Sequence, residues 1–237
     1  MIAEHTVHQA HTIDLRVSDE PWPFAIAHAM DIEAYWLESC ARNPHLFNGG
    51  VFVLREHSLE AGHLRGQYVP ADFASYLYWR DHEIQDQLTC DGFASIFLRS
   101  RQGGYFLAEA AEHTLNGGLY VPPGGLLDAQ DVMASGDVDI SSYVLRELAE
   151  ETGLNRQEIV LEDTYLVVRI GWTVAVAVQA RCTLEDDEVI SRVNAYNKQQ
   201  AEPELGHCLW YNADQKDQVL RMPETTDLLM NYVMQMT

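Results

Sequence analysis

The stretch RELAEETGL, from Arg146 to Leu154, carries an unusual density of negative charge. Three glutamates fall within five residues of it: Glu147, Glu150 and Glu151. Asp139 or Ser141 is placed to cap the start of a helix containing this stretch, and Gly153 stands where a left-handed glycine would end it. At about 100° per residue, the three glutamates then project from one face of the last two helical turns.

These glutamates occupy an electrostatically unfavourable position. The C-terminal end of a helix carries partial negative charge, so anions there are disfavoured. Like charges four residues apart, as in Glu147 and Glu151, add a penalty of about 0.2–0.5 kcal/mol. A run of charges on a helix is ordinarily a solvated face. A divalent cation would convert the repulsion into attraction, because carboxylate oxygens are the ligands that magnesium prefers. The residues alone leave both interpretations open.

The overall charge restricts the partners that the chain can bind. Its 237 residues include 15 basic and 36 acidic side chains, which gives a formal net charge of -21. Binding to nucleic acid through phosphates requires a clustered basic surface, so we expect no nucleic-acid partner. An anionic membrane surface is disfavoured for the same reason. An anionic small substrate would need a few placed arginines or a metal ion.

Cysteine usage and the N-terminus predict a cytoplasmic protein. The four cysteines lie far apart without a C-x-x-C pair, which favours free thiols over disulfides or structural zinc. The beginning, MIAEHTVHQAHTIDL, has neither a basic head nor an apolar run typical of a signal peptide. The most apolar segment, residues 166–180, is too short to span a membrane and includes Arg169, so we expect paired strands there.

Patterning along the chain predicts an α/β (α+β) fold in two parts. Residues 1–88 form a small α+β region, with helices expected over 23–42 and 71–85 and a strand over 51–57. Residues 89–237 form the main domain, in which strands and helices alternate without a regular βαβ period. A hairpin is expected over 92–111, paired strands over 163–182, and helices over 186–200 and 223–236. A mixed sheet flanked by helices fits this order.

The glutamate-rich stretch resembles a known family motif. RELAEETGL is similar to the second half of the Nudix box, G-x5-E-x7-R-E-U-x-E-E-x-G-U, where U is a bulky aliphatic residue. The upstream VPPGG at 121–125 resembles the turn that opens the box. The resemblance implies an α/β/α sandwich and a hydrolase that acts on a nucleoside diphosphate linked to another moiety. It also implies a divalent metal, usually Mg2+, with Mn2+ as an alternative.

The same resemblance implies roles for individual residues. Glu147 and Glu151 are expected as the principal metal ligands, with Glu150 beside them. Arg146 would orient Glu147 through an ion pair, and the backbone carbonyl near Gly125 would help to complete the metal shell.

The first half of the motif departs from the family pattern. Counted back from Arg146, the position of the family glutamate is Val138, and Asp137 or Asp139 would replace it after a one-residue shift. Gly125 lies 21 residues before Arg146, so the intervening loop is about seven residues longer than in the family. Two further acids in this loop are interpreted as solvated in preference to metal-binding: Asp128 and Asp131.

A later segment offers a general base, which takes the proton from the attacking water. Glu202 and Glu204 precede an expected strand, and Glu204 is favoured over Glu202 as the base, although an ordinary surface glutamate is the more frequent role for either residue. Three arginines are candidate phosphate contacts: Arg55, Arg99 and Arg169. Four aromatic side chains are candidates for stacking on a base, with core packing as the alternative for each: Tyr105, Tyr120, Trp172 and Trp210.

The region before the motif suggests a substrate class. Residues 43–66 and 72–81 are similar to the N-terminal region of Nudix proteins related to the UDP-glucose pyrophosphatase branch. This favours a nucleotide sugar such as a UDP-sugar as the substrate. ADP-ribose or a dinucleotide, a non-catalytic nucleotide-sensing module and an isomerase are the alternatives. Val138 favours the sensing module and the intact RELAEE favours the enzyme. A homodimer is left open.

Overall fold

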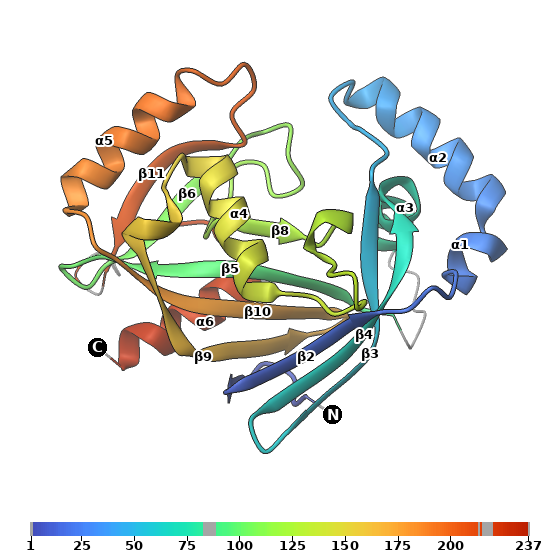
Figure 1. Ribbon diagram of the computed structural model, residues 1–237. Coiled ribbons are helices and arrows are strands. Elements are labelled where there is room, and N and C mark those ends of the chain that lie inside the picture. Colours follow the sequence, from blue (N-terminus) through green and yellow to red (C-terminus); the bar gives the residue numbers. More distant parts are fainter. Residues whose placement is uncertain (1, 83–88, 213, 215–219, 237) are drawn as a thin grey trace.

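A mixed eight-stranded sheet forms the centre of the molecule (Figure 1). The computed structural model describes residues 2–82, 89–212, 214 and 220–236. The strand order is β1 (Val7–Ala10), β9 (Ile159–Ile170), β10 (Thr173–Cys182), β5 (Asp91–Arg99), β6 (Tyr105–Ala110) and β11 (Leu205–Tyr211). β10 and β5 are parallel, whereas β9–β10 and β6–β11 are antiparallel. Two short strands, β7 (Tyr120–Val121) and β8 (Gly124–Leu126), pair with β6 and β5.

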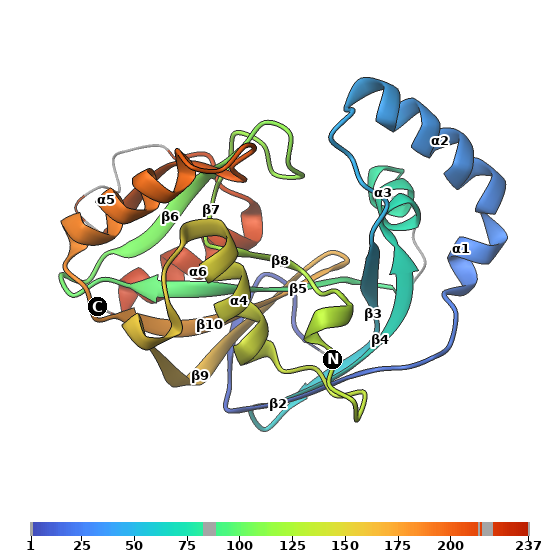
Figure 2. The same cartoon turned by 45° about the horizontal axis from the view of Figure 1, so that its top comes forward.

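Helices cover both faces of this sheet, as Figure 2 shows. α4 (Ile140–Thr152) and α5 (Asp186–Asn197) lie on one face, where Ile96 and Val176 are among the strand residues buried beneath them. α6 (Glu224–Gln235) packs on the opposite face against residues that include Phe97 and Ala177. Because successive strand residues point to opposite faces, one strand supplies both cores. The expected α/β fold with a mixed sheet between helices is confirmed.

The first part of the chain builds a second sheet beside the first. Its order is β2 (Thr12–Val17), β4 (His63–Asp72) and β3 (Gly50–Glu60), accompanied by α1 (Pro23–Ala27), α2 (Ala29–Arg42) and α3 (Phe73–Asp81). β1 nevertheless pairs with β9 of the large sheet, and Leu54 exchanges backbone hydrogen bonds of 3.0 and 2.7 Å with Cys90. These contacts cross the division at residue 88, which stays a prediction.

Two expected elements differ in detail from those observed. The prediction of a single helix over 23–42 is wrong, because the helix is interrupted at His28, whose φ of -112° and ψ of 18° are not helical. The His28 ring packs against Phe24 at a centroid distance of 4.5 Å. The expected hairpin is joined only at Arg99 and Tyr105, because β8 pairs with β5 and β7 pairs with β6 along the edges that would otherwise join the two strands. The end of the helix expected over 71–85 lies outside the described residues.

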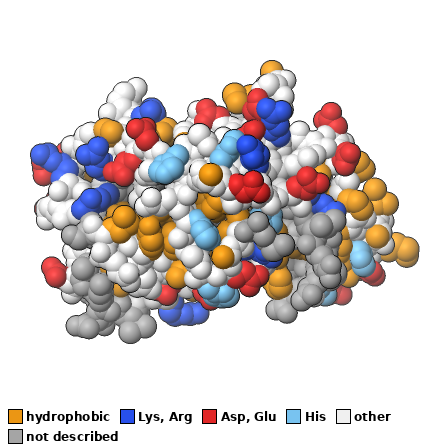
Figure 3. Space-filling model, turned by 90° about the horizontal axis from the view of Figure 1, so that it is seen from below, with side chains coloured by type: hydrophobic (Ala, Val, Ile, Leu, Met, Phe, Trp, Pro, Cys, Tyr) orange, Lys and Arg blue, Asp and Glu red, His pale blue; other side chains and the backbone are white. Residues whose placement is uncertain are grey.

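Apolar side chains remain exposed on the first two helices. Ile26 and Met30 are 67% and 86% exposed, and hydrophobic side chains gather at the right-hand edge of Figure 3, where Figure 1 places α1 and α2. Each of these helices therefore buries only one side. Within the described ranges, no helix has the length and apolar character needed to cross a membrane.

Candidate active site

The helix that carries the glutamates is bounded by its own sequence signals. The Asp139 side chain accepts a hydrogen bond of 3.1 Å from the Ser142 amide and caps the start of α4. Gly153 ends the helix with a φ of 71°, in the left-handed region that favours glycine. A Cβ at Gly153 would stand 2.6 Å from the Tyr196 ring, so the turn is also closely packed. Both predicted helix ends are confirmed, with Asp139 as the cap.

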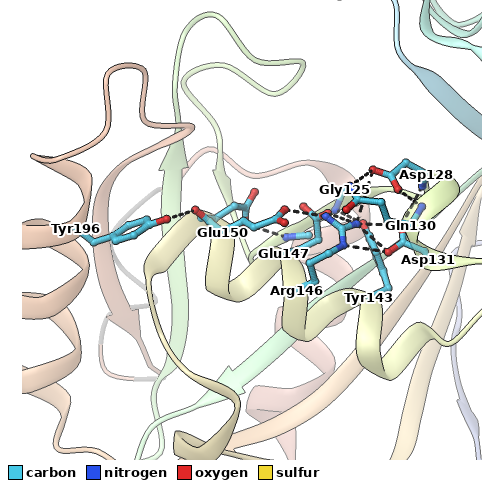
Figure 4. A network of polar contacts seen from close by, with 11 residues as sticks. Gly125, Asp128, Gln130, Asp131, Tyr143, Arg146, Glu147, Glu150 and Tyr196 are labelled. Carbon is cyan, nitrogen blue, oxygen red and sulfur yellow. Dashed lines mark hydrogen bonds and ion pairs between the residues drawn. The ribbon is translucent and has the colours of Figure 1, made fainter.

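Arg146 is the centre of an ion-pair network on α4 (Figure 4). Its Nη2 donates to both carboxylate oxygens of Asp131, at 2.8 and 3.0 Å. The same nitrogen lies 2.8 Å from Glu147 Oε1, while Nη1 donates to Glu150 Oε2 at 2.7 Å. The expected ion pair between Arg146 and Glu147 is therefore present in the structure, and Asp131 holds the guanidinium through Nε and Nη2.

Asp131 is the most deeply buried carboxylate of this network. Its side chain is only 2% exposed. Asp131 ends the short 3-10 helix Ala129–Asp131, and its carboxylate also accepts a hydrogen bond of 2.9 Å from the amide of Asp128, the residue that caps this helix. Burial raises the pKa of the Asp131 carboxyl, while the contacts with the Asp128 amide and Arg146 oppose the rise. The interpretation of Asp131 as a solvated loop residue is wrong.

The spacing of the motif contains the signal that identifies Asp131. Five residues separate it from Gly125, as in the G-x5-E half of the box. Counting back from Arg146 missed it, because the seven extra residues lie between Asp131 and α4. Val138 is a buried core residue, and Asp137 pairs with Arg16 at 2.9 Å.

The glycine turn before the loop packs directly on α4. The Gly124 amide donates to Glu151 Oε2 at 3.2 Å, and the Gly125 amide donates to the Tyr143 hydroxyl at 2.7 Å. Gly124 has a φ of 142°, and a Cβ there would collide with the backbone of β5. A Cβ at Gly125 would come within 4.0 Å of Glu147 Oε2. The turn therefore brings backbone groups beside the carboxylates of Glu147 and Glu151, at the position that the sequence predicts.

Glu147 and Glu151, the two buried glutamates of α4, both have raised pKa values. Burial raises the pKa of Glu147 to about 7; the charge of Arg146 opposes this rise, and the charges of Glu150, Asp131 and Glu204 add to it. The pKa of Glu151 is raised well above its usual value by burial and then by Glu147 and Glu204, against the effect of the Gly124 amide. Neither carboxylate carries its charge easily in this environment.

Glu147 and Glu151 are the side chains that could hold a divalent cation. Among the described residues, no group of three or more His, Cys, Asp or Glu side chains is already arranged to hold a metal ion. Arg146 engages one oxygen of Glu147 and one of Glu150. Glu147 and Glu151 nevertheless present carboxylates one helical turn apart, and the free-energy cost of burying both charges is of the sign that a cation relieves.

A cavity of about 700 Å³ opens beside these groups. Glu151 and Glu204 contribute to its wall together with Gly124 and Gly125. Glu204 thus lies where its charge acts on both Glu147 and Glu151. Glu202, the other expected candidate, instead pairs with His45 at 3.1 Å. The structure brings Glu204 to the site from the loop before β11, as its sequence position predicts.

The other predicted substrate contacts are not brought to this cavity. Arg55 donates to the Thr89 hydroxyl at 2.6 Å, Arg99 ends β5, and Arg169 pairs with Glu4 at 3.6 Å. The Tyr120 hydroxyl lies 3.0 Å from His207 Nδ1. None of these four side chains is among the residues that line the cavity within the described part of the chain.

Of the aromatic candidates, Trp172 lines the cavity, whereas Tyr105 is buried in the core beneath α6 and Trp210 packs edge-on against Phe106. The polar residues of the cavity wall that were not predicted as site residues include Tyr76, Arg80 and Asp91. No local pattern marks them, because they come from α3 and the first position of β5.

Comparison with known proteins finds likeness only among solved structures. No protein-family model matches the chain, and no curated protein sequence matches it. A Nudix hydrolase from M. smegmatis is 18% identical, with 60% of this chain and 83% of that chain covered and a TM-score of 0.42.

An Ap4A hydrolase from C. elegans is 15% identical, with 59% of this chain and 94% of that chain covered and a TM-score of 0.42. A MutT protein from Methanosarcina mazei Go1 is 17% identical, covers 60% and 94%, and has a TM-score of 0.41. At these identities and TM-scores the likeness assigns no activity to this chain.

Proposed function

We propose that this protein is a metal-dependent pyrophosphohydrolase. Its substrate is a nucleoside diphosphate linked to another moiety, and a nucleotide sugar such as a UDP-sugar is our first choice. One observation carries the proposal: Arg146, held by the buried Asp131, contacts Glu147, one turn before Glu151 in the wall of a substrate-sized cavity. A protein without such chemistry has no evident need for two buried carboxylates with raised pKa values.

Each residue of the proposed site has a separate role in the reaction. A bound divalent cation, Mg2+ or Mn2+, neutralises phosphate oxygens and lowers the pKa of water. Glu147 and Glu151 would hold it, with Glu150 beside them and the backbone at Gly125 nearby. Arg146 keeps Glu147 in position through the ion pair. Cleavage breaks one bridging P–O bond as water oxygen bonds to phosphorus, and the products are a nucleoside monophosphate and a sugar phosphate.

Glu204 is the proposed acceptor of the proton that water loses. It lies in the cavity wall and acts electrostatically on Glu147 and Glu151. A base must stand close to the attacking water, so a carboxylate that shares the cavity with the cation ligands is favoured over one outside it. Glu202 is outside this cavity and pairs with His45.

The N-terminal region supports the nucleotide-sugar assignment through its position. Asn48, in the segment that resembles the UDP-glucose pyrophosphatase branch, accepts a hydrogen bond of 2.8 Å from the Ala74 amide. Ala74 lies in the first turn of α3, and α3 supplies Tyr76 and Arg80 to the cavity wall. The segment thus positions a helix that faces the substrate. The sensing-module alternative was favoured by Val138 at the position of a box acid, and we propose that Asp131 supplies that acid.

A substrate screen with matched variants tests the proposal. UDP-sugars, ADP-ribose and dinucleotides are incubated with Mg2+, Mn2+ or EDTA, using the wild type, Glu151→Gln and Glu188→Gln. Glu188 is an exposed helix glutamate on α5 and serves as the control. We expect metal-dependent hydrolysis that Glu151→Gln abolishes and Glu188→Gln retains. Hydrolysis of ADP-ribose alone would make the sugar assignment wrong, and binding without any hydrolysis would favour the sensing module.

The four cysteines are free, as expected for the reducing cytoplasm that we propose as the location.

A further inference from the structure

The cavity contains a buried carboxylate that the reaction above does not use. Asp91 lies at the first position of β5 and contributes to the cavity wall. Its Oδ1 is buried and, among the described residues, accepts no hydrogen bond. Burial raises the pKa of Asp91 to about 6, although the Tyr76 hydroxyl and the charge of Arg80 act against the rise. A buried acceptor without a donor is costly, so it calls for a partner that binds from outside the chain.

The surroundings of Asp91 indicate what kind of partner fits. Arg80 also lines the cavity, and its Nε donates to Asp81 at 3.1 Å. The Asp91 backbone N–H donates a hydrogen bond of 2.8 Å to the Trp172 backbone carbonyl, and Trp172 and Phe93 both line the cavity. A hydrogen-bond acceptor, a cation and apolar aromatic surface therefore adjoin one another. This combination suits a planar or sugar-like group that carries hydrogen-bond donors.

The distance from the proposed cleavage site is right for the far end of a nucleotide. Asp91, Phe93 and Ser95 share one face of β5, and all three line the cavity. Ser95 pairs with Gly124, which donates to Glu151. Ser95 lies four residue steps along the strand from Asp91, a span of about 13 Å. A substrate with its phosphates at Glu151 would extend its nucleoside along β5 towards Asp91.

We propose that Asp91 is a specificity-determining residue that accepts a hydrogen bond from a donor on the nucleoside of the substrate. The donor is an N–H of the base edge or a hydroxyl of the ribose, which share this chemistry. The aromatic side chains beside Asp91 favour the nucleoside over the second moiety as the group bound there. This inference rests on the proposed pyrophosphohydrolase function.

Paired substrate analogues and one isosteric variant test it. The best substrate of the screen is compared with its base-N-methylated and its 2′-deoxyribose analogues, using the wild type, Asp91→Asn and Asp163→Asn. Asp163 is an exposed strand residue on β9 and serves as the control. For Asp91→Asn we expect KM to rise about ten- to a hundredfold, the size of a hydrogen bond to a charged group. We expect kcat to change less than about threefold, because the reacting atoms are distant.

The analogues identify the donor and keep the test independent of folding. One analogue should raise the KM of the wild type by a similar factor and add little in Asp91→Asn: the methylated base indicates the base edge, and the deoxyribose indicates the ribose. If both analogues bind the wild type as well as the parent substrate does, the inference is wrong. An unchanged KM in a folded Asp91→Asn variant would also overturn it.

A binding measurement separates this inference from the proposed function. Titration calorimetry with the nucleoside monophosphates that correspond to the screened substrates, in EDTA, reports nucleoside recognition without hydrolysis. Suppose that the wild type hydrolyses none of the screened substrates, that it binds one monophosphate, and that Asp91→Asn weakens this binding about tenfold or more. The pyrophosphohydrolase proposal then fails, and Asp91 keeps its role in nucleoside binding. If the wild type and Asp91→Asn bind the monophosphate equally well, the inference about Asp91 is overturned while the proposed pyrophosphohydrolase function is unaffected.

Discussion

Replacing Asp131 by asparagine removes the charge that holds Arg146 while preserving the shape of the side chain. Asp131 takes two contacts from Arg146 Nη2 and one of 3.2 Å from Nε. Asparagine retains one acceptor oxygen, but its N–H groups would face the N–H groups of the guanidinium. Removing one partner of a fully buried ion pair costs about 3–5 kcal/mol. Arg146 is 23% exposed and keeps Glu147 and Glu150, so we expect a loss of roughly 2–4 kcal/mol.

Urea unfolding at neutral pH, followed by fluorescence, measures this loss as a shift in midpoint at constant slope. Asp137→Asn is the matched control, since Asp137 lies in the same loop and contacts an arginine at 2.9 Å. That partner, Arg16, is 66% exposed, so the control should lose no more than about 1 kcal/mol. If Asp131→Asn is no more destabilising than Asp137→Asn, the assignment of Asp131 as the anchor of Arg146 is refuted.

Three further outcomes are expected. Gly153→Ala should lower the free energy of unfolding in urea by at least about 2 kcal/mol. The new Cβ would collide with the Tyr196 ring, and alanine would also be strained at the left-handed backbone angle. Gly171→Ala, at a φ of 56° with open space around it, should cost only the strain of about 1–2 kcal/mol, and equal losses would contradict the packing explanation. Because burial raises the pKa of Asp91 from 3.8 to about 6, the wild type should match Asp91→Asn most closely below about pH 4. Its stability relative to that variant should fall by about 3 kcal/mol as pH rises through 6, as urea midpoints across this range would show; a pH-independent difference would argue against the buried charge. Glu147→Gln should abolish metal-dependent hydrolysis and the rise in Tm on adding Mg2+, and an undiminished rise would exclude Glu147 as a ligand.

The candidate site was predictable where its chemistry is local. The cap at Asp139, the left-handed Gly153 and the common face of the glutamates all lie within fifteen residues, so helical geometry alone relates them. The position of Glu204 before a strand was also predictable, because the strand pattern of residues 207–212 is evident in the sequence. A mixed sheet flanked by helices was also expected from the order of strand and helix patterns.

Residues that meet only through the fold could not be placed in this way. Asp131 reaches Arg146 across a loop whose extra residues hide the spacing when it is counted from the helix, and burial of its carboxylate depends on how that loop closes. The interruption at His28 is likewise absent from the helical pattern of residues 23–42.

Local periodicity thus determined the helix, the sheet and the line of glutamates, because backbone geometry sets which neighbouring side chains share a face. The tertiary structure decided which distant groups complete the site. Asp91, Arg80 and Trp172 come from a strand, a helix and a turn that share no sequence pattern. They line one cavity because the two sheets pack together and bury them, and burial is also what gives the carboxylate of Asp91 its raised pKa.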